Sequence, residues 1–248
     1  MHSLILLRHG QSQWNLENRF TGWVDVPLSS QGISEAAMAG KLLREQNFTP
    51  EVLYTSMLDR AIHTGEIVMR ELGRSWVPVH RSWRLNERHY GGLQGLDKSE
   101  TAQKYGDEQV HIWRRSFDVP PPPMDPSSED HPQNDPRYAD VSKSLLPSGE
   151  SLALTRERVL PFLKDELLPA AAAGSTPVVA AHGNSLRAIV MALDEMEPDE
   201  VLQLNIPTGV PIVYSIDQDG TARNRQFLGD PEQIQAMMDA VAQQGKST

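Results

Sequence analysis

Two histidines in this sequence are each followed by glycine, and each comes directly after a short apolar segment. His9 follows Ser3–Leu7 with Arg8 beside it, and His182 follows Pro177–Ala181. Both segments have the length and composition of buried strands. In open α/β sheets, ligands bind beyond the carboxyl ends of the strands. Two histidines in that position can face one pocket, although they lie far apart in the chain.

Such a pair suits phosphoryl transfer. Imidazole has an ordinary pKa of about 6.5, so a neutral ring nitrogen is available near pH 7 and can attack phosphorus. The resulting phosphoramidate keeps the group transferable, and nearby arginines such as Arg8 would stabilise the charge on its equatorial oxygens. A lone histidine is more often structural. Two strand-His-Gly turns, one of them next to an arginine, favour a functional pair.

The elements that must position these residues alternate between strands and helices. The predicted strands are Ser3–Leu7, Val52–Thr55, Trp76–His80, Pro177–Ala181, Val210–Ile216 and Arg223–Phe227. The predicted helices are Glu35–Glu45, capped by Ser29 or Ser30, then Leu58–Leu72, Leu152–Leu168, Leu186–Leu193 and Pro231–Thr248, the last ending in a polar tail. This alternation predicts parallel β-α units in a single α/β domain over residues 1–248.

The middle of the chain is different. Asp118–Pro147 contains four consecutive prolines, Pro120–Pro123, followed by several acidic residues. Long irregular loops inside compact domains are often functional lids, and a solvated, partly mobile insertion is an equally weighted alternative. It is not a domain linker, because candidate catalytic residues lie on both sides of it.

Composition excludes several classes of protein. The 248 residues include no cysteine, which rules out disulfides, a thiolate nucleophile and cysteine-ligated metal sites and is compatible with a reducing compartment. The net charge of −10 argues against nucleic acid as a partner but allows a local basic pocket for a small anion. No apolar run approaches the roughly 20 residues that span a bilayer. We therefore expect a cytoplasmic globular protein without membrane contact.

An ordered set of motifs resembles the histidine phosphatase superfamily. The segment LLRHGQSQWN is similar to its signature. Further segments narrow the resemblance to the phosphoglycerate mutase branch primed by 2,3-bisphosphoglycerate: NRFTGWVDVPLSSQG, YTSMLDRAIHT, LNERHYGGLQGLDK, QVHIWRRSFD, AAHGNSLRA and LNIPTGVPIVY. The resemblance runs from about Leu4 to Gly229. It implies a three-layer α/β/α sandwich whose sheet is mainly parallel with one antiparallel strand.

The resemblance also implies roles for five catalytic residues. His9 matches the phosphorylated nucleophile, and Arg8 and Arg60 match the arginines that grip the transferred group, for which their planar forks are suited. His182 matches the second histidine of the phosphate clamp. Glu87 matches the general acid and base, which the chemistry requires because the substrate hydroxyl must lose and regain a proton.

A larger set matches residues that bind the substrate. Those that match contacts to its carboxylate and its second phosphate are Arg88, Tyr90, Lys98, Arg114 and Arg115. Those that match the remaining polar contacts are Ser12, Asn15, Thr21, Gly22, Gly183 and Asn184. Each type also has a structural use, since such residues form turns, caps and solvated helix faces. The other histidines show no zinc-ligand spacing, so no metal is expected.

The activity that this resemblance implies is the interconversion of 3-phosphoglycerate and 2-phosphoglycerate in glycolysis and gluconeogenesis. Its primer would be 2,3-bisphosphoglycerate, its substrates small anions, and its assembly a homodimer or homotetramer. We also expect the tail, Pro231–Thr248, to help keep water from the phosphohistidine.

Three other activities or roles compete with this one. A bisphosphoglycerate synthase and phosphatase of the same branch is disfavoured by Ser12, because the specialised synthases resemble RHGEG there. Broad histidine phosphatases usually lack the long middle insertion. A non-enzymatic scaffold would predict the loss of His9, Glu87 or His182, and all three are present.

Overall fold

A six-stranded sheet forms the centre of the computed structural model, which describes residues 2–243. Its strands are β1 (His2–Arg8), β2 (Val52–Thr55), β3 (Val79–Arg81), β4 (Pro177–Ala181), β5 (Pro211–Ile216) and β6 (Ala222–Phe227). They lie in the order β3-β2-β4-β1-β5-β6. Neighbours from β3 to β1 pair in parallel, and β5 runs antiparallel to both β1 and β6. The predicted fold class, mainly parallel with one antiparallel strand, is confirmed.

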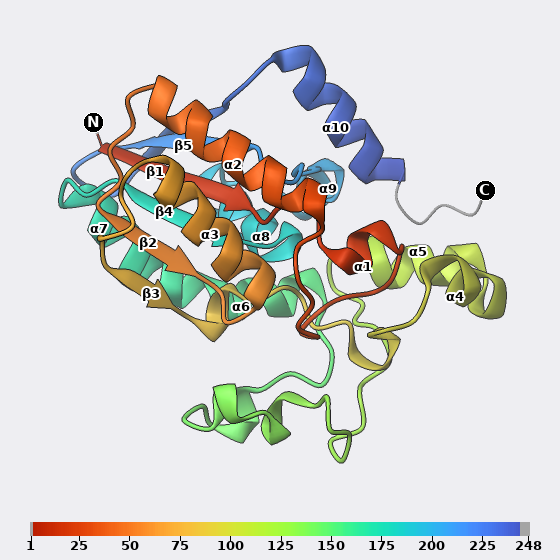
Figure 1. Cartoon of the computed structure of the whole chain (residues 1–248). Coiled ribbons are helices and arrows are strands. Elements are labelled where there is room, and N and C mark those ends of the chain that lie inside the picture. The colour runs from red at the N-terminus through yellow and green to blue at the C-terminus, as the bar shows by residue number, and fades with distance from the viewer. Residues whose placement is uncertain (1, 244–248) are drawn as a thin grey trace.

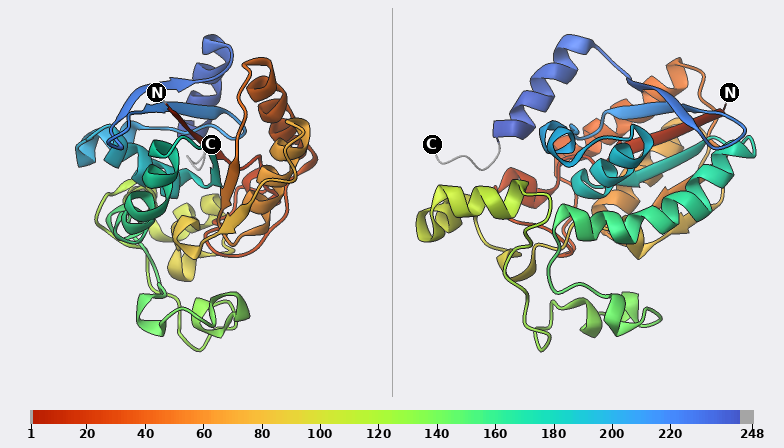
Figure 2. Two further views of the ribbon diagram at one scale, coloured as in Figure 1. Left: turned by 90° about the vertical axis from the view of Figure 1, so that its left-hand side faces the viewer. Right: turned by 180° about the vertical axis from the view of Figure 1, so that it is seen from behind.

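Helices cover both faces of this sheet, as the views in Figures 1 and 2 show. The helices are α1 (Gln13–Leu16), α2 (Ser30–Glu45), α3 (Asp59–Glu71), α4 (Lys98–Tyr105), α5 (Asp107–Arg115), α6 (Leu152–Phe162), α7 (Leu168–Ala172), α8 (Gly183–Leu193), α9 (Pro198–Gln203) and α10 (Pro231–Gln243). Alternate residues of β1 divide between the two layers. Leu4 and Leu6 join the core with α6, α7 and α8, whereas Ile5 and Leu7 join the core with α2 and α3.

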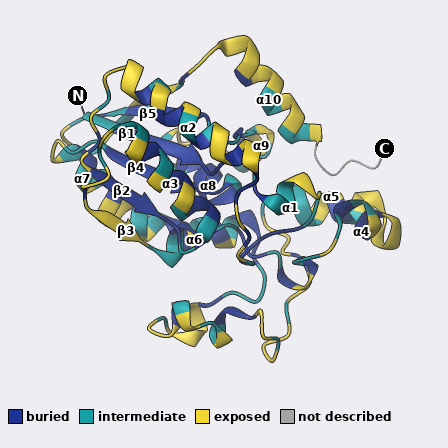
Figure 3. Ribbon diagram, viewed as in Figure 1, coloured by how far each residue is buried: buried dark blue, intermediate teal, exposed yellow. Residues whose placement is uncertain are grey.

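Burial on both faces explains why the central strands have almost no polar residues. All five residues of β4 are buried, and Leu4–Leu7 of β1 are fully buried. Strands covered on both sides become continuous apolar runs instead of alternating patterns. Figure 3 shows the resulting buried centre, with α10 largely exposed at the periphery. No helix within residues 2–243 combines the length and the apolar character needed to cross a membrane.

Several predicted element boundaries need correction. The predicted strand Trp76–His80 begins only at Val79, because Pro78 has no backbone N–H to donate to a ladder and Trp76 is 72% exposed. The predicted helix Leu152–Leu168 is not continuous. Pro161 removes an N–H near its end, and a π-helical turn over Leu163–Leu167 separates α6 from α7.

The other boundary differences are small. Ser29, one of the two predicted caps, accepts a hydrogen bond from Gly32 N at 3.1 Å, so α2 begins at Ser30, before the predicted Glu35. Helix α8 begins at Gly183 instead of Leu186. Of the predicted final helix, α10 ends at Gln243, and the rest lies outside the described residues. Helices α1, α4, α5 and α9 are not among the helices predicted from the sequence.

The irregular insertion over residues 118–147 projects from the body on the side away from α10 (Figure 2). It is irregular as predicted, with three short 3₁₀ turns. It is nevertheless anchored. Tyr138 is 2% exposed and packs with Trp23, and the Tyr138 hydroxyl accepts a hydrogen bond from Asn86 Nδ2 at 2.8 Å.

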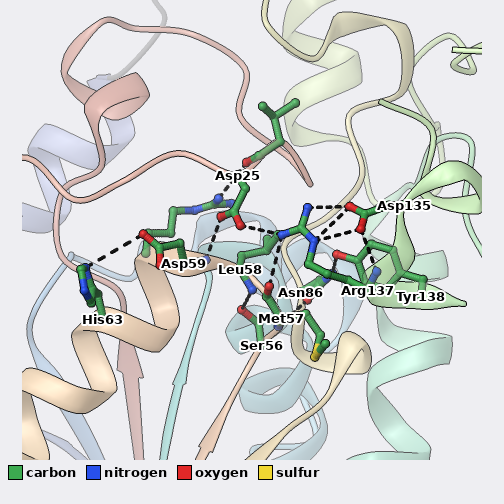
Figure 4. Close-up of polar contacts among 12 residues, drawn as sticks. Asp25, Ser56, Met57, Leu58, Asp59, His63, Asn86, Asp135, Arg137 and Tyr138 are labelled. Atoms are coloured by element: carbon green, nitrogen blue, oxygen red, sulfur yellow. Dashed lines mark hydrogen bonds and ion pairs between the residues drawn. The ribbon is translucent and has the colours of Figure 1, made fainter. Parts of the chain in front are cut away.

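A second anchor of the insertion is ionic (Figure 4). Arg137 pairs with Asp135 and with Asp25 at 2.6 Å each and also donates to the Met57 carbonyl. Asp25 in turn accepts a hydrogen bond from Asp59 N at 2.7 Å, which gives the first turn of α3 a partner. The insertion is thus tied to the start of the helix that carries Arg60.

The proline run of the insertion packs on Gly91 and Gly92. Gly92 N donates to the Pro122 carbonyl at 2.8 Å, and Gly91 has a φ of +56°. A Cβ added at Gly91 would lie 2.1 Å from the Pro122 oxygen, whereas one at Gly92 would come no nearer than 3.4 Å to any atom, the Pro123 oxygen. Only glycine fits the first of these positions without strain.

We therefore expect Gly91→Ala to lower the free energy of unfolding by about 2 kcal/mol or more, because overpacking and a left-handed backbone both oppose a side chain there. Gly92→Ala is the matched control and should cost less than about 1 kcal/mol. Urea unfolding measures both values. Equal losses for the two variants would contradict the packing described.

Candidate active site

A cavity lies beyond the carboxyl ends of β1 and β4. Thirteen of the predicted site residues line it: Arg8, His9, Asn15, Thr21, Gly22, Arg60, Glu87, Tyr90, Lys98, Arg114, Arg115, Gly183 and Asn184. His182 lies directly behind His9, with ring centroids 4.9 Å apart and planes at 62°. The parallel register that pairs Arg8 with Ala181 brings these two histidines to the same edge of the sheet.

Hydrogen bonds determine which nitrogen of the His9 ring carries the proton. Its Nδ1 lies 2.7 Å from the Gly10 carbonyl oxygen, which can only accept, so Nδ1 carries the proton. Nε2 therefore keeps its lone pair, which accepts a hydrogen bond from Arg60 Nε at 3.3 Å. Burial, followed by the charges of Arg60 and Arg8, holds the pKa of His9 well below 6.5. The ring is therefore neutral near pH 7.

The ring of His182 is held by Ser56. The Ser56 hydroxyl lies 2.7 Å from His182 Nε2 and accepts a hydrogen bond from Leu58 N. The direction of the contact with His182 depends on which ring nitrogen carries the proton. The ring is fully buried at the start of α8, and burial, followed by the charge of Arg60, holds the pKa of His182 well below 6.5.

Two arginines flank the histidines with their guanidinium groups fixed by carbonyl oxygens. Arg60 is 1% exposed and donates to the carbonyls of Gly22 and Val24 at 2.7 and 3.1 Å. Burial lowers the pKa of Arg60 to about 10, which leaves it charged at pH 7. Arg8 donates to the Ile206 carbonyl at 2.7 Å, and its Nε is without a partner in the described part of the chain. Both cations are therefore held in place before any ligand arrives.

Glu87 also lines the cavity, next to the first turn of α8. Its Oε1 accepts hydrogen bonds from Asn184 N at 3.0 Å and from Arg88 N at 2.8 Å. A Cβ added at Gly183 would lie 3.6 Å from both Glu87 Oε2 and the Arg8 guanidinium. The carboxylate thus borders the space next to Arg8 and His9, where a reacting hydroxyl would have to lie. That placement suits a proton acceptor and donor.

A second group of cations enters the cavity from α4 and α5. Lys98 is 9% exposed, and burial together with Arg114 and Arg8 lowers its pKa to about 7. Burial raises the pKa of Tyr90, but the charges of Arg88 and Arg114 and the hydrogen bond with Arg88 together outweigh that effect, so the net pKa is lowered. Arg115 donates to Asn205 Oδ1 at 3.2 Å. These groups disfavour one another's charge, so an anion placed among them would be bound strongly.

Two predicted binding residues do not line the cavity. Arg88 is 1% exposed, stacks 4.6 Å from the Tyr90 ring centroid and donates to the Arg114 carbonyl at 2.8 Å. Ser12 is fully buried and caps α1, exchanging hydrogen bonds with Asn15. Both residues position a neighbour that does line the cavity.

Sequence reasoning missed some residues that the structure brings into this region. Arg187 lines the cavity, donates to Asn184 Oδ1 at 3.2 Å and to the Val201 carbonyl, and has its pKa lowered to about 9 by burial. Its spacing, three residues after Asn184 on one helix, was the signal available. The others that line the cavity are Arg19, Phe20, Leu204, Asn205, Ile206 and Val241. Ser56 was missed because only the fold brings it to His182.

The charge balance of the cavity is one-sided. Among the described residues that line it are seven arginines and lysines and a single carboxylate, Glu87. The same part of the chain contains no group of three or more His, Cys, Asp or Glu side chains that could hold a metal ion. The arrangement can bind an anion, attack it with a neutral imidazole and move a proton through one carboxylate.

Comparison with known families agrees with this geometry. The sequence model of the histidine phosphatase superfamily (branch 1) matches residues 4–143 and 124–226. The chain belongs to this superfamily. Its branch 1 model thus covers both histidine turns as well as Arg60 and Glu87.

Solved structures of similar fold include both phosphatases and a mutase. YhfR of Bacillus stearothermophilus is 23% identical, with a TM-score of 0.68 over 89% of this chain and 94% of its own. A mycobacterial glucosyl-3-phosphoglycerate phosphatase is 22% identical, with a TM-score of 0.67 over 92% and 97%. Phosphoglycerate mutase from Bacillus anthracis is 21% identical, with a TM-score of 0.64 over 99% and 97%. At these identities the likeness concerns the fold alone.

The neutral state of the buried histidines predicts how stability depends on pH in this superfamily member. The folded pKa values of His9 and His182 lie below 6.5, so the unfolded chain binds more protons below about pH 6.5. The free energy of unfolding should therefore fall as pH decreases, by about 1.4 kcal/mol per pH unit for each such histidine.

In His9→Asn, the free energy of unfolding should fall less steeply between pH 6.5 and 5.5, because the contribution of one of the two histidines is lost. The exposed His63 provides the control, and His63→Asn should keep the slope of the unaltered protein. Urea unfolding at pH 7.5, 6.5 and 5.5 measures it. Parallel curves for His9→Asn and the unaltered protein would show that His9 is not held neutral.

Proposed function

We propose that this chain is a phosphoglycerate mutase, which interconverts 3-phosphoglycerate and 2-phosphoglycerate through phospho-His9 and is primed by 2,3-bisphosphoglycerate. One observation supports it above the others. A single cavity holds Arg8 and Arg60 beside the nucleophile and a second group of cations from α4 and α5. A ligand with two anionic ends, one transferred and one retained, suits that arrangement.

In the first half of the proposed cycle, the 2-hydroxyl oxygen of 3-phosphoglycerate attacks the phosphorus on His9. A P–O bond forms while the P–N bond breaks, Glu87 takes the hydroxyl proton, and His9 Nε2 recovers its lone pair. Arg8, Arg60 and His182 stabilise the equatorial oxygens during this transfer.

In the second half, the bound bisphosphate turns so that its 3-phosphate faces His9. His9 Nε2 attacks this phosphorus, a P–N bond forms while the bond to the 3-oxygen breaks, and Glu87 returns its proton to that oxygen. 2-Phosphoglycerate leaves, and His9 is phosphorylated again. In both halves, Lys98, Arg114 and Arg115 hold the phosphate and carboxylate that do not react. No step in this cycle uses a metal.

The second candidate is a phosphatase, in which water takes the place of the substrate hydroxyl. It is favoured by the mycobacterial phosphatase, which shares the fold to a similar degree. Helix α10 favours the mutase instead. Val241 lines the cavity, and its carbonyl accepts from Arg115 Nη2 at 3.5 Å, so the end of α10 helps keep water out. Cytoplasmic location and assembly as a homodimer or homotetramer stay predictions.

The mutase proposal predicts that 2-phosphoglycerate forms from 3-phosphoglycerate in the presence of a chelator and faster after addition of 2,3-bisphosphoglycerate. ³¹P NMR follows the products directly. His9→Ala should lose at least about a thousandfold in rate, because the covalent intermediate forms on His9, whereas His63→Ala should keep the rate of the unaltered protein.

The unaltered protein should also carry acid-labile, base-stable phosphate after incubation with the primer. Inorganic phosphate and glycerate as the sole products would instead identify a phosphatase.

Helix α10 gives a further prediction. A chain that ends at Ala240 loses Val241 and should release phosphate from phospho-His9 to water at least about tenfold faster relative to mutase turnover, because the cavity opens to solvent. A chain that ends at Gln243 lacks the last five residues but keeps Val241. Comparison of the two truncated chains therefore separates the contribution of Val241 from that of the last five residues. If the ratio of mutase to phosphatase turnover is unchanged in both truncated chains, α10 and the tail have no such role.

A further inference from the structure

A buried ion pair lies behind the segment that carries Glu87 and lines no part of the cavity. Glu150 is 4% exposed and Arg158, in α6, is 7% exposed. Arg158 Nε and Glu150 Oε1 lie 2.6 Å apart, and Arg158 Nη2 and Glu150 Oε2 lie 2.9 Å apart. Two charges buried together cost desolvation and are rarely a net source of stability. The contacts that this pair makes therefore indicate what it does.

The Arg158 guanidinium donates to three backbone carbonyls of the segment before and at Glu87. They are Arg84 O at 2.6 Å, Asn86 O at 3.0 Å and Glu87 O at 2.8 Å. The Glu87 carbonyl also accepts from Trp23 Nε1 at 2.5 Å, and Arg158 lies over the Trp23 ring at 5.4 Å. Two donors from distant parts of the chain thus fix this one carbonyl.

Glu150 fixes the other side of Glu87. Its Oε2 accepts from His89 N at 2.8 Å, and its own N–H donates to the His89 carbonyl at 2.8 Å. The backbone is therefore held on both sides of Glu87, by the cation before it and by the carboxylate after it. A planar guanidinium bonded to a carboxylate through two nitrogens gives a fixed geometry that a flexible ammonium cannot reproduce.

On the cavity side, the Glu87 carboxylate depends on that backbone. Its Oε1 accepts from the N–H of Arg88, the next residue, and from Asn184 N across the cavity. If the backbone at residues 86–89 turned, both of these bonds would change together. A displacement of about 1 Å at a reacting group can cost roughly a hundredfold in rate.

We propose that the Glu150–Arg158 ion pair is a positioning element that fixes the backbone of Asn86–His89 and so holds the Glu87 carboxylate where it can move the substrate proton. The inference rests on the proposed role of Glu87 as acid and base. It adds two residues that never touch the substrate and to which the family motifs gave no role.

The test compares two phosphate donors. Release of an alkoxide, as from 2,3-bisphosphoglycerate, needs the proton from Glu87, whereas p-nitrophenolate leaves without one. In Arg158→Lys, the rate of His9 phosphorylation by 2,3-bisphosphoglycerate should fall about a hundredfold, with KM changed less than about threefold. The rate with p-nitrophenyl phosphate should change less than about threefold. Glu150→Gln should show the same selective loss to a smaller degree, because its amide oxygen still accepts from His89 N.

Two controls make the result decisive. Glu87→Gln must show the same dependence on the leaving group, and if it does not, the proposed role of Glu87 fails. Arg225→Lys alters another arginine–carboxylate pair, with Asp194 at the far end of α8, and should change both rates less than about twofold. If Arg158→Lys and Glu150→Gln slow both donors equally while Glu87→Gln is selective, the pair is merely structural and the inference is overturned. Should Arg158→Lys prove unfolded by circular dichroism, Glu150→Gln alone decides in the same way.

Discussion

The parallel pairing of β1 with β4 is the constraint on which the rest of this structure depends. Because Arg8 is in register with Ala181, the residues that follow each strand emerge side by side. The His9 N–H then continues the ladder to the Ala181 carbonyl at 3.0 Å, and the two imidazoles lie 4.9 Å apart. A change of register by one residue would turn every side chain of β1 to the opposite face. The apolar runs of both strands, buried by helices on each side, prevent such a change.

Burial then determines the chemistry of these two rings. Desolvation and the neighbouring arginines make the imidazolium form unfavourable, so both histidines remain neutral near pH 7. The hydrogen bond to the Gly10 carbonyl places the His9 proton on Nδ1 and leaves a lone pair at Nε2. Ser56 holds the ring of His182 through its Nε2.

The positively charged side chains around the cavity repel one another, and an anionic ligand would offset that repulsion. Six arginines, one lysine and one carboxylate line a small space within a chain whose net charge is −10. The backbone carbonyls of Gly22, Val24, Ile206 and Val201 accept hydrogen bonds from these guanidinium groups. Such contacts fix the cations without cancelling their charge. The cavity is thus prepared for phosphate before it binds, which is how preorganised sites reduce the cost of reaction.

The six strands, apart from some of their boundaries, and the two histidine turns could be predicted from local patterns in the sequence, and the family motifs pointed to most of the residues that line the cavity. This was possible because apolar runs and strand-His-Gly turns are local patterns, and because the motifs keep their order along the chain. The folded chain was needed to show that Ser56 contacts the ring of His182, that Arg88 and Ser12 position neighbours, and that Glu150 and Arg158 bond the segment around Glu87. Ser56 and His182 are 126 positions apart, and Arg158 and Glu87 are 71 apart. Hydrogen bonds between such residues follow from the packing of whole layers, for which no short stretch of sequence carries a signal.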